Sequence, residues 1–403
     1  MARTILIVLL LLVPVLSRPV PAETKNPLEM SWPQVEETAK GSTVRFYMFG
    51  GWAKVNQWVD TRAAGDLKKD FGINLKRVPM NAPVFINKLL TEKSAGKRKG
   101  TIDLLWINGE NFKKAAETGL LLGPFAAGLP NFKKYVDPAT VSHDFGYPVK
   151  DREAPYGRAQ FVFEYDTART PDPPRSVAEL EKWVKANPGR FTYPQPPDFT
   201  GSAFIRQLFY ALTGGHEQYL AGFDPRLLEK NVPKLWAFLN ELKPHLWQRG
   251  RSYPKDSATL DTLFARGEVD LNMSYHPPHA QAKILEGTFP PSVRTFVMTE
   301  GSIFNTHFTT IPFNAPNPAG AMVAANYLLS PRAQLSKFDP EEWGDFPALD
   351  LGRLDETWRA RFRAVDLGPA TLSPEELAKT AVPEIPSDYL EALEVGWEKH
   401  VLR

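Results

Sequence analysis

The sequence predicts an α/β protein made of two compact halves, and three observations lead to this prediction. Strand-like and helix-like segments alternate from residue 43 to residue 107, as they do in a domain with a mostly parallel sheet. A second alternation, from residue 160 to residue 298, has apolar helix faces of its own. The chain has 403 residues, which is enough for two domains with separate cores.

The amino-terminal segment has the pattern of a secretory signal peptide. Arg3 precedes an apolar run over residues 5–16, and Val20-Pro21-Ala22 supplies small residues where a signal peptidase cleaves. We expect a signal peptide over residues 1–22, because the run is shorter than the roughly 20 residues that span a bilayer. A membrane anchor that stays attached is the alternative.

The cysteine count favours a particular compartment. The chain has 0 cysteines, so it has no residue that a lipoprotein lipid could modify, and its core must be stable without disulfides. A freely diffusing exported protein needs an outer membrane to retain it. We therefore expect a soluble protein in the periplasm of a Gram-negative bacterium.

The first half begins with a helix, for which Ser31 and Gln34 supply a capping box and Gly41 an end. Strands are predicted over residues 43–49, 73–78 and 102–107, the last with the continuous apolar character of a buried parallel strand. Helices are predicted between them, from the Gly50-Gly51-Trp52 turn to about residue 69 and again near Pro83.

The second half is predicted to follow the same plan. Strands are expected over residues 161–165, 269–274 and 293–298, with a short β-like segment at 191–193. Ser176 and Glu179 form a second capping box, and further helices are expected over residues 201–213 and 232–242.

The chain then returns to the first half through a strand at 308–313 and a helix at 319–329, after which Ser330-Pro331 starts another. Ser373 and Glu376 form a third capping box in a polar tail that the pattern does not assign to either half. Two short connections permit a hinge motion while limiting lateral slip. We expect one lobe from residues 23–158 and 308–340, a second from 159–307, an unassigned segment 341–403, and crossings near 158–166 and 307–313.

Common catalytic and metal motifs are missing from the sequence. It has no Gly-x-Ser-x-Gly elbow, no Gly-x-x-x-x-Gly-Lys phosphate loop and no His-Glu-x-x-His helix. His276 and His279 flank two prolines that hold them roughly 9 Å apart, which makes a poor chelate, so we expect no metal and no cofactor. His276 is either one wall of a pocket or a packed histidine. The net charge of +2 gives no reason to expect nucleic acid as a partner.

Polar and aromatic residues follow the ends of several predicted strands. In open α/β sheets, ligands bind outside the carboxyl ends of the strands, so we expect these loops to converge on a ligand. The predicted ligand residues are Gly51, Trp52, Asn108, Gly109, Glu110, Asn111, Arg158, Asp198, Phe199, Thr200, Gly201, Ser202, Tyr275, His276, Glu300, Phe304 and Asn305.

These residue types suit a small solute that is polar and flat. Glycines permit close backbone approach, and the helix start after Thr200 would offer free N–H groups to an acceptor. Trp52 and Phe304 could stack on a ring, while Glu110 and Glu300 could neutralise a cation. The alternative for any single residue is ordinary turn chemistry, since loops are rich in Gly, Asn and Asp.

Several segments resemble the extracellular solute-binding proteins of bacterial ABC importers, in the branch of polyamine, thiamine and iron binders. Residues 101–112 look like the ligand loop of the first lobe, and residues 155–165 look like the first crossing strand. Residues 264–271 are similar to the entry into a second-lobe strand, and residues 301–312 look like the return. The most specific segment is 324–334, Ala-Ala-Asn-Tyr-Leu-Leu-Ser-Pro-Arg-Ala-Gln.

The resemblance implies the class II periplasmic-binding-protein fold, with a mixed, mostly parallel sheet flanked by helices in each lobe and two crossing strands as the hinge. It also implies a monomer without enzymatic activity. Such a protein captures a small polar solute, for which a cationic heteroaromatic compound like thiamine is one candidate. Its partner is an ABC importer permease in the inner membrane.

Two other functions stay open on the residues alone. One is an exported hydrolase that uses Glu110 and Glu300 as a carboxylate pair for acid and base catalysis. The other is a scaffold that kept the fold and lost the pocket.

Overall fold

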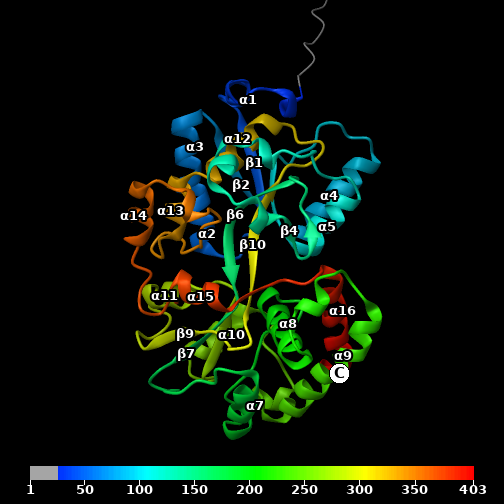
Figure 1. The fold of residues 1–403 in the computed structure, drawn as a ribbon, viewed down its shortest axis with the longest axis vertical. Coiled ribbons are helices and arrows are strands. Elements are labelled where there is room, and N and C mark those ends of the chain that lie inside the picture. The colour runs from blue at the N-terminus through cyan, green and yellow to red at the C-terminus, as the bar shows by residue number, and fades with distance from the viewer. Residues whose placement is uncertain (1–25) are drawn as a thin grey trace, which may run out of the picture.

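The computed structural model describes residues 26–403, so the expected signal peptide lies outside the described part of the chain. Figure 1 shows two lobes, one above the other, with β6 and β10 running side by side between them. Buried hydrophobic side chains form two large clusters, one centred on each lobe. The predicted α/β class with two lobes is confirmed.

No helix within residues 26–403 has the length and apolar character needed to cross a bilayer.

The first lobe is built on a mixed sheet in the order β11-β10-β3-β1-β2, with β6 also paired to β10. The strand β1 pairs in parallel with β2 and β3, as the alternating pattern predicted, whereas β10 is antiparallel to β3 and β6. The strands are β1 (Thr43–Met48), β2 (Asn74–Pro79), β3 (Leu104–Ile107), β6 (Glu153–Gln160), β10 (Ser302–Thr310) and β11 (Ala381–Pro383); β4 (His143–Asp144) and β5 (Tyr147–Pro148) form a small hairpin.

Helices cover this sheet. The helix predicted over residues 52–69 is one helical run whose middle, Val59–Ala63, has π-helical geometry. At the predicted first cap, the Ser31 backbone N–H donates to Gln34 Oε1 at 3.0 Å. The helices are α1 (Trp32–Ala39), α2 (Ala53–Trp58), α3 (Ala64–Phe71), α4 (Ala82–Ser94), α5 (Gly109–Glu117), α6 (Pro130–Tyr135), α12 (Pro318–Leu328), α13 (Pro331–Phe338) and α14 (Glu356–Arg363).

The second lobe differs from the prediction in how its strands pair. Its sheet has the order β8-β7-β9, and both neighbours run antiparallel to β7, so this sheet is not mostly parallel. The reason is that β7 enters from the hinge in the direction opposite to β8 and β9, and it occupies the centre. The strands are β7 (Val162–Asp166), β8 (Leu271–Ser274) and β9 (Val293–Phe296).

The second lobe also contains seven α-helices among the described residues. The helix predicted to start near residue 232 begins earlier, because the Asp224 side chain accepts from the N–H groups of Arg226 and Leu227. The β-like segment 191–193 is not a strand, although its aromatic side chains are buried. The helices are α7 (Val177–Ala186), α8 (Phe199–Thr213), α9 (Pro225–Leu242), α10 (Ser257–Ala265), α11 (His279–Leu285), α15 (Pro374–Thr380) and α16 (Ser387–Trp397).

Within residues 26–403, three chain segments connect the lobes, where the sequence predicted two. The strand β6 continues into β7, and β10 crosses beside it as residues 302–310, earlier than the expected 307–313. The third connection follows α14 over residues 364–371. Phe362 packs in the first-lobe core, whereas the Ala370 N–H donates to Gln281 of the second lobe at 3.3 Å.

The segment 341–403 therefore contributes to both cores. Trp343 is buried in the first lobe, and Tyr389 and Trp397 are buried in the second. The red carboxyl-terminal helix α16 lies beside α8 and α9 in Figure 1. A hinge motion of the lobes must therefore be accommodated by three connections and not by two.

Candidate functional site

The strand ends and helix starts of the two lobes enclose a cleft of about 540 Å³. Its first-lobe wall comes from the ends of β1 and β3 and the starts of α2, α4 and α5. Its second-lobe wall comes from the starts of α8 and α10 and the loop after β8, and hinge residues such as Asn305 form its base. This volume falls in the range of small-molecule sites.

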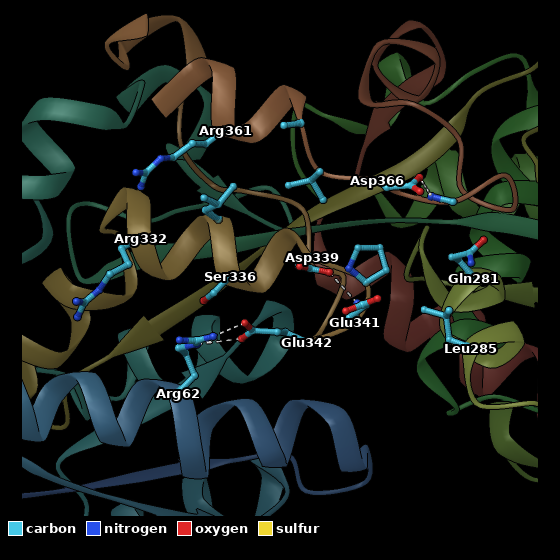
Figure 2. A pocket seen from close by; sticks show the side chains of 15 residues that line it. Arg62, Gln281, Leu285, Arg332, Ser336, Asp339, Glu341, Glu342, Arg361 and Asp366 are labelled. Atoms are coloured by element: carbon cyan, nitrogen blue, oxygen red, sulfur yellow. Dashed lines mark hydrogen bonds and ion pairs between the residues drawn. The ribbon is translucent and has the colours of Figure 1, made fainter. Parts of the chain in front are cut away.

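A second pocket, of about 670 Å³, lies beside the third connection and is lined from both lobes. Figure 2 shows its charged side chains, of which Arg62 is already paired with Glu342. Arg332 pairs with Asp66 and Asp70. Because these arginines are already paired, we place the candidate site in the interlobe cleft.

Aromatic rings form much of the cleft surface. The rings of Trp52 and His276 pack edge to face, with their centroids 4.6 Å apart, although the two residues come from different lobes. Trp106 packs against His307 in the same manner at 5.0 Å. The aromatic residues that line the cleft are Phe49, Trp52, Phe85, Trp106, Phe145, Phe199, Tyr275 and Trp343.

Glu110 supplies a carboxylate at the start of α5. Burial raises the pKa of the Glu110 carboxyl above its ordinary value, and the nearby Glu394 of the second lobe raises it further. The Asn111 side chain donates a hydrogen bond to this carboxylate, and a backbone hydrogen bond from Glu110 itself partly offsets the effect of burial on the pKa. Among the described residues that line the cleft, none is a lysine or an arginine. A cationic group of a ligand could therefore pair with Glu110.

The side chain and backbone next to Glu110 are already used within the protein. Asn108 Oδ1 accepts from the Trp106 indole N–H at 3.0 Å, and its amide donates to the Thr306 carbonyl at 2.6 Å. The Gly109 N–H donates to Asp144 at 2.7 Å. These two residues shape the wall of the cleft and leave Glu110 as the group with capacity for a ligand.

The helix start in the second lobe is occupied, in contrast to the prediction of free N–H groups. Asp198 Oδ1 accepts from the N–H groups of Thr200 and Gly201, each at 3.0 Å, and so caps α8. A Cβ on Gly201 would lie 2.0 Å from the Pro194 carbonyl oxygen, so this glycine is needed for packing. Thr200 lines the cleft without offering its N–H.

Two histidines of the second lobe have opposite environments. His279 bonds Glu164 at 2.9 Å and Asp261 at 3.0 Å; although burial opposes it, these carboxylates raise the pKa of His279 to about 10. His276 Nε2 is buried and has no hydrogen-bond partner among the described residues. Burial lowers the pKa of His276 to about 3, so its ring is neutral.

The hinge strand β10 presents alternate residues to the cleft. Asn305 and His307 line it, and Phe304 does not, because successive side chains of a strand point to opposite faces. The Oδ1 atom of Asn305 is buried without a partner among the described residues. His307 Nε2 lies 3.1 Å from Asp345, which is also paired with the buried Lys337.

Comparison with known proteins identifies the family. A family model described as bacterial extracellular solute-binding protein matches residues 62–359. The chain is also 40% identical over 349 residues to Protein YnjB of Escherichia coli (strain K12), covering 85% of this chain and 89% of that protein. The chain belongs to the bacterial extracellular solute-binding proteins. This confirms the resemblance seen in the sequence.

Solved structures of periplasmic binding proteins share the fold of this solute-binding protein. AfuA from Actinobacillus pleuropneumoniae, with fructose-6-phosphate bound, aligns with a TM-score of 0.62 at 14% identity, covering 89% of this chain and 98% of that one. A periplasmic thiamin binding protein aligns with a TM-score of 0.58 at 18% identity, covering 90% and 96%. At these identities the likeness establishes the fold alone.

Six predicted ligand residues of this solute-binding protein do not line the cleft. Arg158 donates to Thr140 at 3.1 Å, and Ser202 donates to Glu394. A Cβ on Gly51 would meet the Phe49 ring, so Gly51 supports the wall without forming it. The six are Gly51, Arg158, Gly201, Ser202, Glu300 and Phe304; the others, Trp52, Asn108, Gly109, Glu110, Asn111, Asp198, Phe199, Thr200, Tyr275, His276 and Asn305, line it.

The placement of Glu300 removes the carboxylate pair on which the hydrolase alternative depended. Glu300 Oε1 accepts from the Val177 N–H at 2.8 Å, at the start of α7 and outside the cleft lining. Glu110 lies in the cleft and therefore has no partner in Glu300 for acid and base catalysis.

Several cleft residues of this solute-binding protein had not been predicted. Trp106 and His307 belong to strands. Trp106 lies in a continuously apolar strand and His307 in a strand whose start was misplaced, so alternation could not mark either as facing the cleft. Phe145 has a positive φ of 43°, and no sequence signal indicates its position. The residues missed are Phe49, Val55, Met80, Asn81, Ala82, Phe85, Trp106, Ile107, Phe145, Ala159, Ser257, Asp261, Met273, Ser274, His279, His307 and Trp343.

Proposed function

We propose that this chain is the substrate-binding component of an ABC importer and that it captures a small cationic solute with a flat, aromatic part. One observation carries the proposal: the cleft combines aromatic walls and the Glu110 carboxylate with no lysine or arginine among its described lining residues. Aromatic faces and a carboxylate both attract a cation. A phosphorylated solute would meet one cationic lining residue, His279, which is already paired with Glu164 and Asp261.

The geometry also explains how capture would be signalled. Trp52 and His276 come from opposite lobes and are in contact in this structure, so we expect this contact to break when the lobes open. A solute that contacts both lobes binds the closed form more tightly and shifts the protein toward it. The closed form is the one that we expect a membrane permease to recognise.

The energy required is within reach of such a site. A micromolar dissociation constant corresponds to about 8 kcal/mol. One charge pair with Glu110, stacking on the aromatic walls and a few hydrogen bonds can supply this.

We further propose that the protein acts in the periplasm as a monomer. The amino-terminal pattern of residues 1–22 supports export, and the absence of cysteine from the chain argues against a lipid anchor. Mass spectrometry of the mature protein from a periplasmic extract should show a chain that begins at Glu23.

The test is a titration with three probes of different charge and shape. Thiamine is a flat cation, spermidine a flexible polycation and fructose 6-phosphate an anion. We expect thiamine to bind most tightly by calorimetry and to change the tryptophan fluorescence, and fructose 6-phosphate not to bind. Tight binding of the phosphate ester without binding of either cation would contradict the proposal.

Two variants that differ only in position provide the control. Glu110→Gln removes the cleft carboxylate, and Glu300→Gln removes one outside the cleft lining. Only the first should weaken binding. The bound solute should be recovered unchanged by chromatography, and its consumption would favour an enzyme.

A further inference from the structure

Within the proposed function, we infer that His276 and Asn305 form a neutral hydrogen-bonding subsite that recognises an N–H donor group on the flat part of the solute. The inference depends on there being a solute in this cleft, and it goes further by naming a chemical group of that solute. It starts from two polar atoms that the protein buries and leaves without partners.

Buried polar atoms are nearly always hydrogen-bonded, so each exception requires an explanation. Several buried side-chain atoms lack partners within residues 26–403, but only His276 Nε2 and Asn305 Oδ1 belong to residues that line the cleft. His276 lies near His307, and His307 is two residues from Asn305 on the same face of β10. Both residues therefore line one region of the cleft, and each brings to its wall a buried polar atom without a partner among the residues described.

The chemistry of the two atoms specifies the group that they can bind. An amide oxygen such as Asn305 Oδ1 only accepts, so the solute must supply a donor. His276 is neutral, because burial keeps its pKa far below 6.5, so it adds no charge that would attract an anion. The matching group is a neutral exocyclic amino group on the ring, separate from the cationic group that pairs with Glu110.

The shape of the region indicates where that group is attached. The edge-to-face contact between Trp52 and His276 holds the imidazole in one orientation at the wall. A flat ring that lies along these aromatic walls would present its substituents in the plane of the ring. The solute class is therefore an amino-substituted heteroaromatic cation.

A binding role and a structural role predict different effects on the empty protein. An unpartnered buried polar atom destabilises the fold, and an apolar residue of similar shape removes that cost. His276→Phe keeps a ring against Trp52 and removes the nitrogens, and Asn305→Leu removes the acceptor. Both variants should melt at or above the wild-type temperature when empty.

The experiment measures binding of thiamine and oxythiamine, in which a carbonyl oxygen replaces the amino group of the pyrimidine ring. We expect the wild type to prefer thiamine by at least tenfold. His276→Phe and Asn305→Leu should each weaken thiamine binding about tenfold. In both variants the ratio of the two dissociation constants, oxythiamine to thiamine, should fall toward one. Phe304→Leu is the control, because Phe304 lies on β10 beside Asn305 and outside the cleft lining. This variant should change neither the affinity for thiamine nor the preference for thiamine over oxythiamine.

The outcomes separate this inference from the proposed function. Equal binding of the two probes, or an unchanged preference in both cleft variants, would overturn the subsite and leave solute capture intact. A lower melting temperature of both empty variants would assign the side chains a structural role; His276→Gln and Asn305→Asp then repeat the binding measurement with polarity retained. If thiamine, oxythiamine and spermidine all fail to bind the wild type, the proposed function and the subsite both fail.

Discussion

The two walls of the cleft use similar residue types in different ways. On the first-lobe wall, Glu110 receives one hydrogen bond from its neighbour Asn111 and has capacity for a ligand. On the second-lobe wall, His276 Nε2 has no hydrogen-bond partner within residues 26–403. Asp198, however, caps α8 and also accepts from Ser257, and His279 is bonded at both nitrogens. A position at the cleft therefore does not by itself make a residue a ligand contact, because the side chain must also have unused hydrogen-bonding capacity.

The largest expected effect comes from the occupied wall. His279→Phe leaves the carboxylates of Glu164 and Asp261 buried without their cation, and breaking a buried ion pair costs about 3–5 kcal/mol. Urea unfolding should show that loss in the free energy of unfolding. His276→Phe, three residues away, is the matched control and should cost nothing. If His279→Phe lowered the free energy of unfolding by less than about 1 kcal/mol, the proposed difference between the two walls would be wrong.

The next effect concerns the wall with free capacity. Glu110→Gln should weaken binding of a cationic solute about 10- to 100-fold, which corresponds to roughly 1.4–2.8 kcal/mol. The melting temperature of the empty protein should not fall, because a buried carboxyl is replaced by a neutral amide of the same shape. Calorimetry measures the affinity and a melting curve measures the stability of the empty protein, both on the same preparation. The control Glu300→Gln should leave both quantities unchanged.

The pH dependence of binding should follow the ionisation of Glu110. Burial raises its pKa above 4.5 in the empty protein, and a cation binds the ionised form. Affinity should therefore increase as the pH rises from 4.5 through the raised pKa. The contribution of Glu110 to folding stability has the opposite sign: it is present below pH 4.5 and is lost as the pH rises through the same interval. Both trends should be absent in Glu110→Gln, and a pH-independent affinity in the wild type would contradict this.

The smallest effect is expected outside the cleft, at an ion pair that joins the lobes. Lys113 of α5 lies 2.7 Å from Asp388 of α16, and both side chains are partly exposed, so the pair is worth about 1 kcal/mol or less. Lys113→Ala should speed solute dissociation a few-fold in stopped-flow measurements, less at high salt. Lys185→Ala, which breaks pairs inside the second lobe, should leave the rate unchanged.

The sequence was most informative where local patterns decide the structure. Alternation of strands and helices predicted β1, β2 and β3, and the loops after β1 and β3 supplied Trp52 and Glu110 to the cleft. It was less informative in the second lobe, where the pairing around β7 depends on how the chain enters from the hinge. Nor could it show that Asp198 would use the N–H groups at the start of α8.

Errors in strand boundaries affected the site in a predictable way. The return strand was expected from residue 308, whereas β10 begins at Ser302. Without that boundary, alternation could not separate Asn305, which faces the cleft, from Phe304, which does not. Trp343 was missed for another reason: it lies just after α13, in the tail that the sequence pattern did not assign to either half.

That third connection also has a consequence for the order in which the molecule can assemble. The first-lobe core needs Phe362, and the second-lobe core needs Tyr389 and Trp397, whose indole N–H donates to Tyr193 at 3.0 Å. Neither core is therefore complete until almost the whole chain has been synthesised. A shortened chain that ends before Ser387 should expose apolar surface on its second lobe and bind a hydrophobic dye, which the full-length protein should not.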